Sequence, residues 1–470
     1  MPRHPLALLP ALAGRRLPFL LDGAPVPGGG TSFAGADPAR VLVARGDRVR
    51  LTHRRGGSVH RENPFDALAR EVARGDFALA VGFLGYELGR FAETMPDPVP
   101  DDLHLPELHV AFYDDVVRFD RPSTRIPTLP DDPEPVPLPP GAAGALTSSL
   151  PRAAYLDAVR DVKVRLVAGD AYQVNVTQRI RVPLPAGASP AALYRRLRAE
   201  SPAPFGAFLE CHGFQVLSNS PERLLRFDAA TRRLETQPIK GTRGRHADPV
   251  RDVQAAADLR ADPKERAEHV MIVDLQRNDL GRVCAPGSVR VDGLLRVESF
   301  AHLHHLVSTV SGRVREGVGL AEILRATFPG GSITGAPKVE AMRVVRRCEP
   351  VRRGIYCGAL GYFRPDGSFD LALPIRTAVV QSGSLHVYAG GGVVADSTPA
   401  GEVEESWLKA TAFLRACGVV AHSIRVPAKR SLCPPGRIRS ASGRHRADFV
   451  VPASPPTPRP SPGGGGVQAL

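Results

Sequence analysis

No apolar run in this 470-residue sequence approaches the roughly 20 residues that a helix needs to cross a bilayer. The apolar stretch at the start of the chain is interrupted by Pro5 and Pro10 and is followed by Arg15 and Arg16. Such an interrupted stretch is not the pattern of a secretory signal. We therefore expect a cytoplasmic protein without a membrane partner.

Paired cysteines are missing as well. The six cysteines are widely scattered, and no two have the spacing of a zinc knuckle or a redox motif. Because neither a disulfide framework nor a thiolate metal site is indicated, we expect reduced and mostly buried thiols.

The sequence also has no basic stripe interleaved with aromatic residues, the pattern that is typical of nucleic-acid binding. The net charge is +13, but residues 423–470 hold eight Lys/Arg and one Asp and so account for +7 of it. These residues are rich in Pro, Ser and Gly, which predicts a disordered tail. A nucleic-acid-binding function would require salt-dependent binding that is lost with this tail. We expect no nucleic-acid partner.

What the sequence does contain is a mixture of strand and helix patterns without regular βαβ alternation, which predicts an α+β fold. Residues 109–120 are expected to form a strand pair, and residues 369–380 read as strand. Helices are expected at 152–169, 251–260, 263–281, 319–328, 337–347 and 401–417.

The composition divides the chain into three parts. A Pro-Gly-Ala-rich linker at 131–144 predicts an N-terminal lobe over residues 1–145 and a second domain over residues 146–422, which the family resemblance given below implies to be the catalytic domain. Within the second part, residues 171–182 alternate as in a strand. The polar side chains of this strand face either solvent or a site, and they are Gln173, Asn175, Thr177 and Arg179.

A hairpin is predicted where the runs 224–227 and 234–236 form two arms, and Pro238 ends the second arm. Lys240 then lies at a strand end or in a turn. Such a lysine is either a solvated loop cation or an amine with a lowered pKa that attacks an electrophilic carbon.

Two helices each present a pair of carboxylates. Glu265 and Glu268 share one face, and Glu402 and Glu405 share a face with Lys409. Four carboxylates brought together would repel one another unless a cation lay between them, and Mg²⁺ prefers such oxygen ligands. The alternative is two ordinary solvated helix faces.

Two Gly-rich turns, at 329–338 and 389–392, could approach a ligand with their backbone or could be ordinary tight turns. The first is not a Walker A loop, because Ala336 and Pro337 interrupt the Gly-Lys step. Arg376 lies among apolar residues in an expected strand. It needs an anion, either a protein acid or a substrate carboxylate.

These motifs resemble those of the chorismate-utilising enzymes, which include anthranilate, aminodeoxychorismate, isochorismate and salicylate synthases. The resemblance covers residues 150–417 in order. Its motifs are Gly169-Asp-Ala-Tyr-Gln-Val-Asn-Val-Thr-Gln178, Ser220-Pro-Glu-Arg223, Pro238-Ile-Lys-Gly-Thr242, Val273-Asp-Leu-Gln-Arg-Asn-Asp-Leu-Gly-Arg282, His305-Leu-Val-Ser308, Phe328-Pro-Gly-Gly-Ser-Ile-Thr-Gly-Ala-Pro-Lys338 and Ala389-Gly-Gly-Gly-Val-Val. It implies large antiparallel sheets that form a two-sheet core flanked by helices.

The resemblance also implies roles for single residues. Glu222 would be the general acid that protonates the leaving C4 hydroxyl, and the carboxylates that bind Mg²⁺ would be Glu265, Glu268, Glu402 and Glu405. The residues expected to hold or line the substrate are Gln173, Thr242, His305, Ser332, Tyr356, Arg376, Gly391, Gly392 and Lys409.

Two positions distinguish the members of the family. Gln173 stands where the water-adding members have a lysine, and it therefore indicates ammonia as the nucleophile. Lys240 stands where anthranilate synthases usually have alanine, and lysine there is typical of aminodeoxychorismate synthase component I, in which this amine is thought to act as a nucleophile. The resemblance thus implies amination of chorismate at C4, with a class I glutamine amidotransferase subunit as the partner. The alternative is anthranilate synthase component I.

Overall fold

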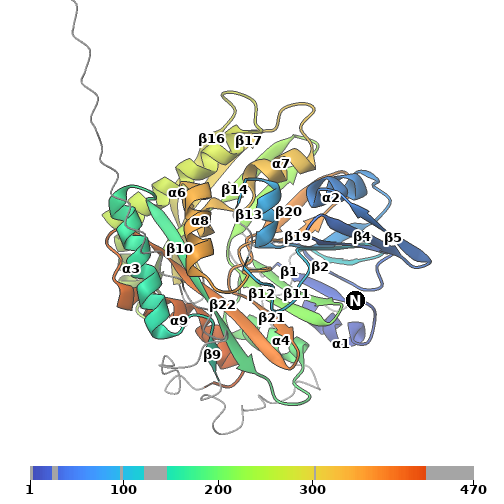
Figure 1. Ribbon diagram of the computed structural model, residues 1–470, viewed down its shortest axis with the longest axis horizontal. Coiled ribbons are helices and arrows are strands. Elements are labelled where there is room, and N and C mark those ends of the chain that lie inside the picture. The colour runs from blue at the N-terminus through green and yellow to red at the C-terminus, as the bar shows by residue number, and fades with distance from the viewer. Residues whose placement is uncertain (1–3, 24–29, 96–98, 121–145, 301–302, 420–470) are drawn as a thin grey trace, which may run out of the picture. The chain divides into compact units, whose positions relative to one another are not determined.

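The computed structural model describes residues 4–23, 30–95, 99–120, 146–300 and 303–419. The expected linker at 131–144 and the tail at 423–470 lie outside these residues. Two large antiparallel sheets flanked by helices make up the described structure, which confirms the predicted α+β fold (Figure 1). Within the described ranges, no helix has both the length and the apolar character needed to cross a membrane.

Sheet A contains ten strands in the part of the chain that the structure describes. In sheet order they are β18 (Gly335–Ala336), β10 (Gln173–Pro183), β22 (Ser384–Val393), β21 (Thr377–Gln381), β12 (Phe214–Ser220), β11 (Phe205–Cys211), β1 (Phe19–Asp22), β2 (Ser32–Gly35) and β8 (Val117–Phe119), while β9 (Thr147–Ser148) pairs with β10. The pairing of β10 with β22 sets Asn175 opposite Gly392.

Sheet B contains twelve strands in the same described ranges. In sheet order they are β15 (Ile239–Gly244), β17 (Leu303–Arg313), β14 (Arg233–Gln237), β13 (Arg223–Asp228), β20 (Phe369–Ala372), β19 (Ala359–Phe363), β6 (Leu79–Leu84), β7 (Leu108–Tyr113), β3 (Arg40–Arg45), β4 (Arg48–His53) and β5 (Gly56–Arg61), while β16 (Arg290–Ser299) pairs with β17. The predicted hairpin is confirmed as β13 and β14, which pair antiparallel.

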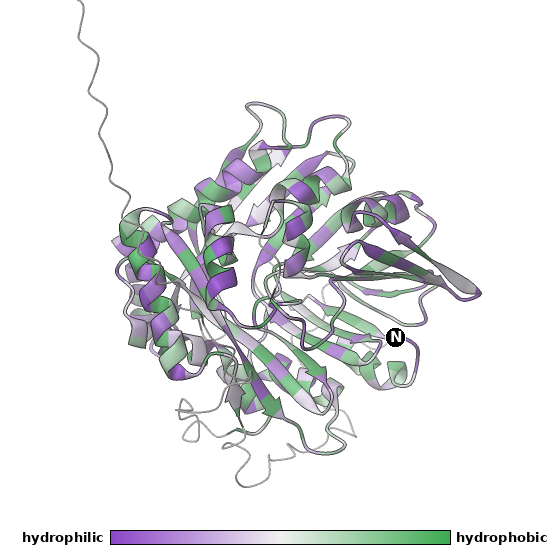
Figure 2. Ribbon diagram, in the orientation of Figure 1, coloured by the Kyte–Doolittle hydropathy of each residue, from purple (hydrophilic) through white to green (hydrophobic). Residues whose placement is uncertain are grey.

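The helices cover the outer faces of both sheets. Their bounds are α1 (Leu9–Leu12), α2 (Pro64–Ala73), α3 (Arg152–Ala168), α4 (Pro190–Glu200), α5 (Pro249–Ala261), α6 (Pro263–Gly281), α7 (Leu320–Thr327), α8 (Lys338–Cys348) and α9 (Pro399–Ala416). Figure 2 shows both hydrophilic and hydrophobic residues along these helices, as expected where one face packs on a sheet.

Three apolar clusters define the layers. One lies between sheet A and the helices α3, α4, α8 and α9, and it includes Trp407. A second lies between sheet B and the helices α2, α6 and α7, and it includes Phe328. The third joins the two sheets through residues such as Phe83 and Phe214. Residues before 145 supply strands to both sheets, so they share these clusters with the later residues.

Two stretches of sequence, each expected to form a single strand or a pair of neighbouring strands, are divided between the two sheets. The predicted strand pair at 109–120 is wrong, because β7 belongs to sheet B and β8 to sheet A. Residues 369–380 likewise form β20 in sheet B and β21 in sheet A, where the chain passes from one sheet to the other. Pro374 lies in this passage, and its missing N–H is compatible with a break in the ladder.

Candidate active site

Lys240 is the second residue of β15, so it lies near the start of a further strand and not in a turn after β14. The register of β15 against β17 shifts between Lys240 and Thr242, and Gly241 in this bulge has φ +82°. A Cβ at Gly241 would lie 3.1 Å from Oε2 of Glu265, so glycine suits both the backbone and the space. The bulge places Lys240 beside helix α6.

The side chain of Lys240 reaches sheet A. Its Nζ lies 3.2 Å from Oε1 of Gln173 on β10 and donates a hydrogen bond to it. Burial lowers the pKa of the Lys240 amine, while the negative charge of Glu268 acts in the opposite direction. Lys240 is therefore a largely desolvated amine rather than a solvated loop cation.

Gly392 provides the room in which these groups meet. A Cβ at this position would lie 3.0 Å from both Nζ of Lys240 and Nε2 of Gln173. Among the described residues, Nε2 of Gln173 has no hydrogen-bond partner although it is buried. The polar face of β10 therefore points into the protein, and at Gln173 it offers a free donor to a ligand.

Glu222 follows β12 and is buried, with 4% of its surface exposed. Ser332, in the short helix η4 (Gly331–Ile333), donates a hydrogen bond of 2.7 Å to its Oε1. Burial raises the pKa of Glu222 to about 7, and the Ser332 hydroxyl and the Lys240 charge limit the rise. A carboxyl group with this pKa can hold a proton near neutrality and can act as a general acid.

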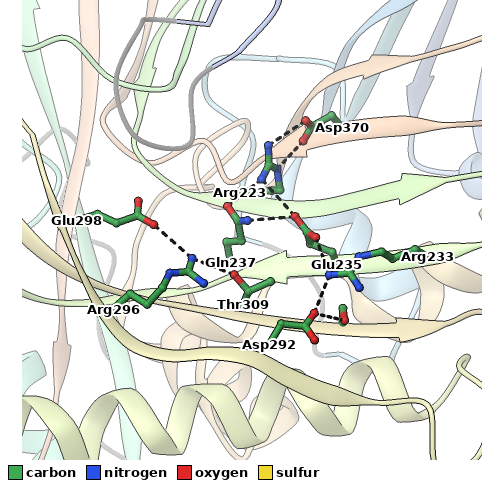
Figure 3. Close-up of polar contacts among 10 residues, drawn as sticks. Arg223, Arg233, Glu235, Gln237, Asp292, Arg296, Glu298, Thr309 and Asp370 are labelled. Atoms are coloured by element: carbon green, nitrogen blue, oxygen red, sulfur yellow. Dashed lines mark hydrogen bonds and ion pairs between the residues drawn. The ribbon is translucent and has the colours of Figure 1, made fainter.

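Arg223, next to Glu222, fixes the start of β13 (Figure 3). It forms two hydrogen bonds with Asp370 on β20, of 3.0 and 3.2 Å, and one of 2.8 Å with Gln237 on β14. Glu235 adds an ion pair at 3.4 Å. These contacts hold the backbone that presents Glu222.

Arg376 and His305 line a common cavity together with Phe300. Nδ1 of His305 lies 3.0 Å from the Thr242 hydroxyl. Burial first, and the Arg376 charge second, lower the pKa of His305 to about 4, so the imidazole is neutral. No described carboxylate forms an ion pair with Arg376, whose pKa is lowered by burial. Its guanidinium is therefore available to an anion.

The expectation that Arg376 lies in a strand is wrong. The residue precedes β21 and has a left-handed backbone with φ +49°.

Tyr356 was expected to hold the substrate, but it belongs to the hydrophobic core. Its ring stacks on that of Tyr388, with the ring centroids 5.6 Å apart. Its place beside the substrate stays a prediction.

The carboxylate pairs lie on α6 and α9, as predicted. Asp262 caps the N-terminus of helix α6, and its side chain accepts hydrogen bonds from the backbone N–H groups of Lys264 and Glu265. A Cβ at Gly391 would lie 2.4 Å from Oε2 of Glu402, so this carboxylate packs directly on the backbone of β22. Within the described part of the chain, Oε2 of Glu402 is buried without a hydrogen-bond partner.

The charges of this acidic region are only partly balanced. Lys409 binds Glu405 at 2.7 Å and the carbonyl of Gly390 at 2.8 Å. Burial raises the pKa of Glu265 and of Glu402, and the neighbouring Glu268 and Glu405 raise them further. In the described ranges, no group of three or more His, Cys, Asp or Glu residues is arranged so that it could hold a metal ion. The oxygen-only donors and the unpartnered Oε2 of Glu402 nevertheless fit Mg²⁺.

Sequence reasoning missed His269. This residue lies one helical turn after Glu265 on α6 and is fully buried. Its Nδ1 lies 3.4 Å from the carbonyl oxygen of Lys240, and its Nε2 lies 2.7 Å from the hydroxyl of Ser308. The i, i+4 spacing from a candidate ligand was the one local signal that could have indicated it.

Comparisons with known proteins agree with this geometry. A profile of the chorismate binding enzyme family matches residues 25–415. Anthranilate synthase component 1 of Thermus thermophilus is 43% identical over 361 residues, which cover 72% of this chain and 77% of that protein. Aminodeoxychorismate synthase component 1 of Salmonella typhimurium is 37% identical over 402 residues, which cover 81% of this chain and 88% of that protein.

A solved structure shares the fold. The crystal structure of anthranilate synthase component I from Streptococcus pneumoniae superposes with a TM-score of 0.72 and 28% identity, and the match covers 82% of this chain and 92% of that one. The family profile spans most of the chain and includes every residue of the site described above. The chain therefore belongs to the family of chorismate binding enzymes.

Proposed function

We propose that this protein is aminodeoxychorismate synthase component I, which converts chorismate and ammonia to 4-amino-4-deoxychorismate and water. The observation that carries the proposal is the Lys240 amine, which lies in the site 3.2 Å from Gln173 and has a pKa lowered by burial. A separate lyase would then release p-aminobenzoate for folate synthesis.

The reaction would proceed in two displacements. The neutral amine of Lys240 forms a bond to ring C2 while the C4–O bond breaks, and Glu222 donates its proton so that water leaves. Ammonia next forms a bond to C4, and the C2–N bond breaks to release Lys240 as a neutral amine. The proton of the new C4 ammonium returns to Glu222. Dividing one hard displacement into two easier ones is the advantage of a covalent intermediate.

The surrounding residues would bind and orient the ring. The guanidinium of Arg376 and the backbone of Gly391 and Gly392 would hold the substrate carboxylates. The sides of the ring would be lined by Gln173, Thr242, His305, Ser332 and Tyr356. The neutral His305 suits such contact, because its pKa of about 4 leaves it uncharged at physiological pH.

Glu268 and Glu405 would bind Mg²⁺, with Glu265 and Glu402 in or next to its coordination shell and Lys409 beside them. When bound, the ion would neutralise a substrate carboxylate and bring the two acidic helices together. The residues of this chain then keep the ring close to Lys240.

Ammonia would come from a class I glutamine amidotransferase subunit in a cytoplasmic heterodimer. The relatives named above are component 1 proteins, which supports a second component for this chain. Full turnover of glutamine by the purified chain alone would contradict this part of the proposal.

Anthranilate synthase component I is the second candidate, and the 43% identity to the Thermus thermophilus protein favours it. Product analysis separates the two. The purified chain is incubated with chorismate, Mg²⁺ and an ammonium salt at alkaline pH, with and without an added aminodeoxychorismate lyase. We expect p-aminobenzoate only with the lyase, whereas anthranilate formed without the lyase would favour the second candidate.

A further inference from the structure

We propose that His269 is a positioning residue that holds the backbone of Lys240 through a chain of directed hydrogen bonds. The catalytic consequence rests on the proposed function, whereas the chain of hydrogen bonds does not. Its members come from four segments that meet beside the site, namely β16, β17, α6 and β15.

Three contacts make up the chain. The backbone N–H of Leu295 on β16 donates to Oγ of Ser308 on β17 at 3.0 Å. Oγ of Ser308 lies 2.7 Å from Nε2 of His269, and Nδ1 of His269 lies 3.4 Å from the carbonyl oxygen of Lys240. Both Ser308 and His269 are fully buried, so water does not compete for these groups.

The chemistry of the two ends fixes the direction of every bond. A backbone N–H can only donate and a carbonyl can only accept, whereas a neutral imidazole has one N–H and one acceptor nitrogen. The N–H of His269 must therefore be at Nδ1, facing the Lys240 carbonyl. Nε2 is then the acceptor, and the single hydroxyl proton of Ser308 points to it. In the opposite tautomer, two lone pairs would face each other at Lys240.

The hydrogen bond from Nδ1 of His269 contacts β15 at the point where the strand is irregular. The register against β17 shifts immediately after Lys240, and Gly241 has φ +82°. A donor from α6 therefore stabilises the Lys240 peptide at the point where the regular ladder is interrupted.

The Lys240 amine has a specific partner at the other sheet. Its Nζ donates a hydrogen bond to Oε1 of Gln173, 3.2 Å away. A rotation of the Lys240 peptide would move the amine away from this position. Misplacement of a reacting group by about 1 Å can cost roughly 100-fold in rate.

Two substitutions separate positioning from core filling. In His269→Asn the amide can replace Nδ1 and donate to the Lys240 carbonyl, whereas in His269→Gln the longer amide replaces Nε2 and serves only Ser308. We expect kcat to fall about tenfold or more in His269→Gln and by less than about threefold in His269→Asn, with the KM for chorismate within about threefold in both. The proposal would be overturned if His269→Gln and His269→Asn lost kcat equally and in proportion to their losses of thermal stability.

His109→Asn is the matched control. His109 is also buried, on β7, and its ring stacks on Phe83 with centroids 5.8 Å apart. We expect this substitution to lower thermal stability without changing kcat. A loss of kcat equal to that in His269→Gln would show that any buried histidine has the same effect, and it would contradict the proposal.

Nitrogen-15 NMR of the histidine-labelled wild-type protein tests the hydrogen bonds without any substitution. The His269 ring should show a protonated Nδ1 and an unprotonated Nε2, and Ser308→Ala should shift the Nε2 resonance. A protonated Nε2 would overturn the proposal whatever product the enzyme makes. If Nδ1 is protonated and His269→Asn retains activity but the product is anthranilate, the positioning role stands and the proposed function fails.

Discussion

Nζ of Lys240 donates a hydrogen bond to Oε1 of Gln173 across 3.2 Å, although the two residues belong to different sheets. The contact joins the edge of sheet B to a strand of sheet A. It directs one N–H of the lysine toward Gln173. The Nε2 of Gln173, which has no partner among the described residues, is left for a ligand. The two residues that the sequence resemblance singled out are therefore in direct contact.

The pH dependence of kcat/KM should follow the proton of Glu222. Its pKa of about 7 means that the acid form is lost as the pH rises through 7, so kcat/KM for chorismate should fall above this value at constant free ammonia. The Ser332 hydroxyl lowers this pKa, and Ser332→Ala should therefore move the decline to higher pH. A decline that stays in place, or that moves to lower pH, would exclude Glu222 as the titrating acid.

Gly392→Ala should impair activity without unfolding the protein. The added Cβ would lie 3.0 Å from the Lys240 amine and the Gln173 amide, and overpacking of this kind costs about 1–3 kcal/mol. We expect kcat/KM to fall by roughly 10-fold or more. Gly244→Ala, on the same strand as Lys240 and with open space around its Cβ, should leave kcat/KM unchanged. Equal effects of both substitutions would contradict this account of the site.

Arg376→Gln should raise the KM for chorismate. The guanidinium has no carboxylate partner among the described residues, and a hydrogen bond to a charged group is worth about 1.5–3 kcal/mol, or roughly 10- to 100-fold in affinity. Removal of a desolvated and unpaired charge should also leave thermal stability equal or higher. Arg277→Gln on the exposed face of α6 is the control. An unchanged KM in Arg376→Gln would show that the carboxylates bind elsewhere.

Mg²⁺ should stabilise the folded protein. The ion would bind where the pKa values of Glu265 and Glu402 are raised by burial and by neighbouring carboxylates, so it should raise the melting temperature. At a free Mg²⁺ concentration of 100 times its Kd, the free energy of unfolding should increase by about 2.7 kcal/mol. Glu402→Gln should reduce the shift, whereas Glu404→Gln on the exposed face of α9 should not. The same shift in Glu402→Gln would exclude Glu402 from the metal site.

Local patterns were sufficient for elements whose partners are near in sequence. The hairpin of β13 and β14 was predicted because its arms are joined by a short turn. The helix at 152–169 was predicted because its apolar spacing ends at Gly169, which has φ +83°. Both signals lie within a few residues of the structure that they specify.

The errors have a common physical cause, since strand patterns do not show which sheet a strand will join. The run that contains Arg376 is apolar on both sides, but the chain changes sheets there and the residue adopts a left-handed backbone. The contact between Lys240 and Gln173 spans 67 residues, and no local pattern in the sequence indicates it. His269 was missed because its partner Ser308 is 39 residues away.

The most direct test is mass spectrometry of the purified protein after incubation with chorismate and Mg²⁺ in the absence of ammonia. We predict an increase equal to the mass of chorismate less one water, located on Lys240, absent in Lys240→Met and lost when an ammonium salt is added. Lys163→Met, which removes a part-buried lysine bound to the carbonyl of Ser397, should still form the adduct. Amination of chorismate at an undiminished rate by Lys240→Met, without any adduct in the wild type, would contradict the proposed role of Lys240.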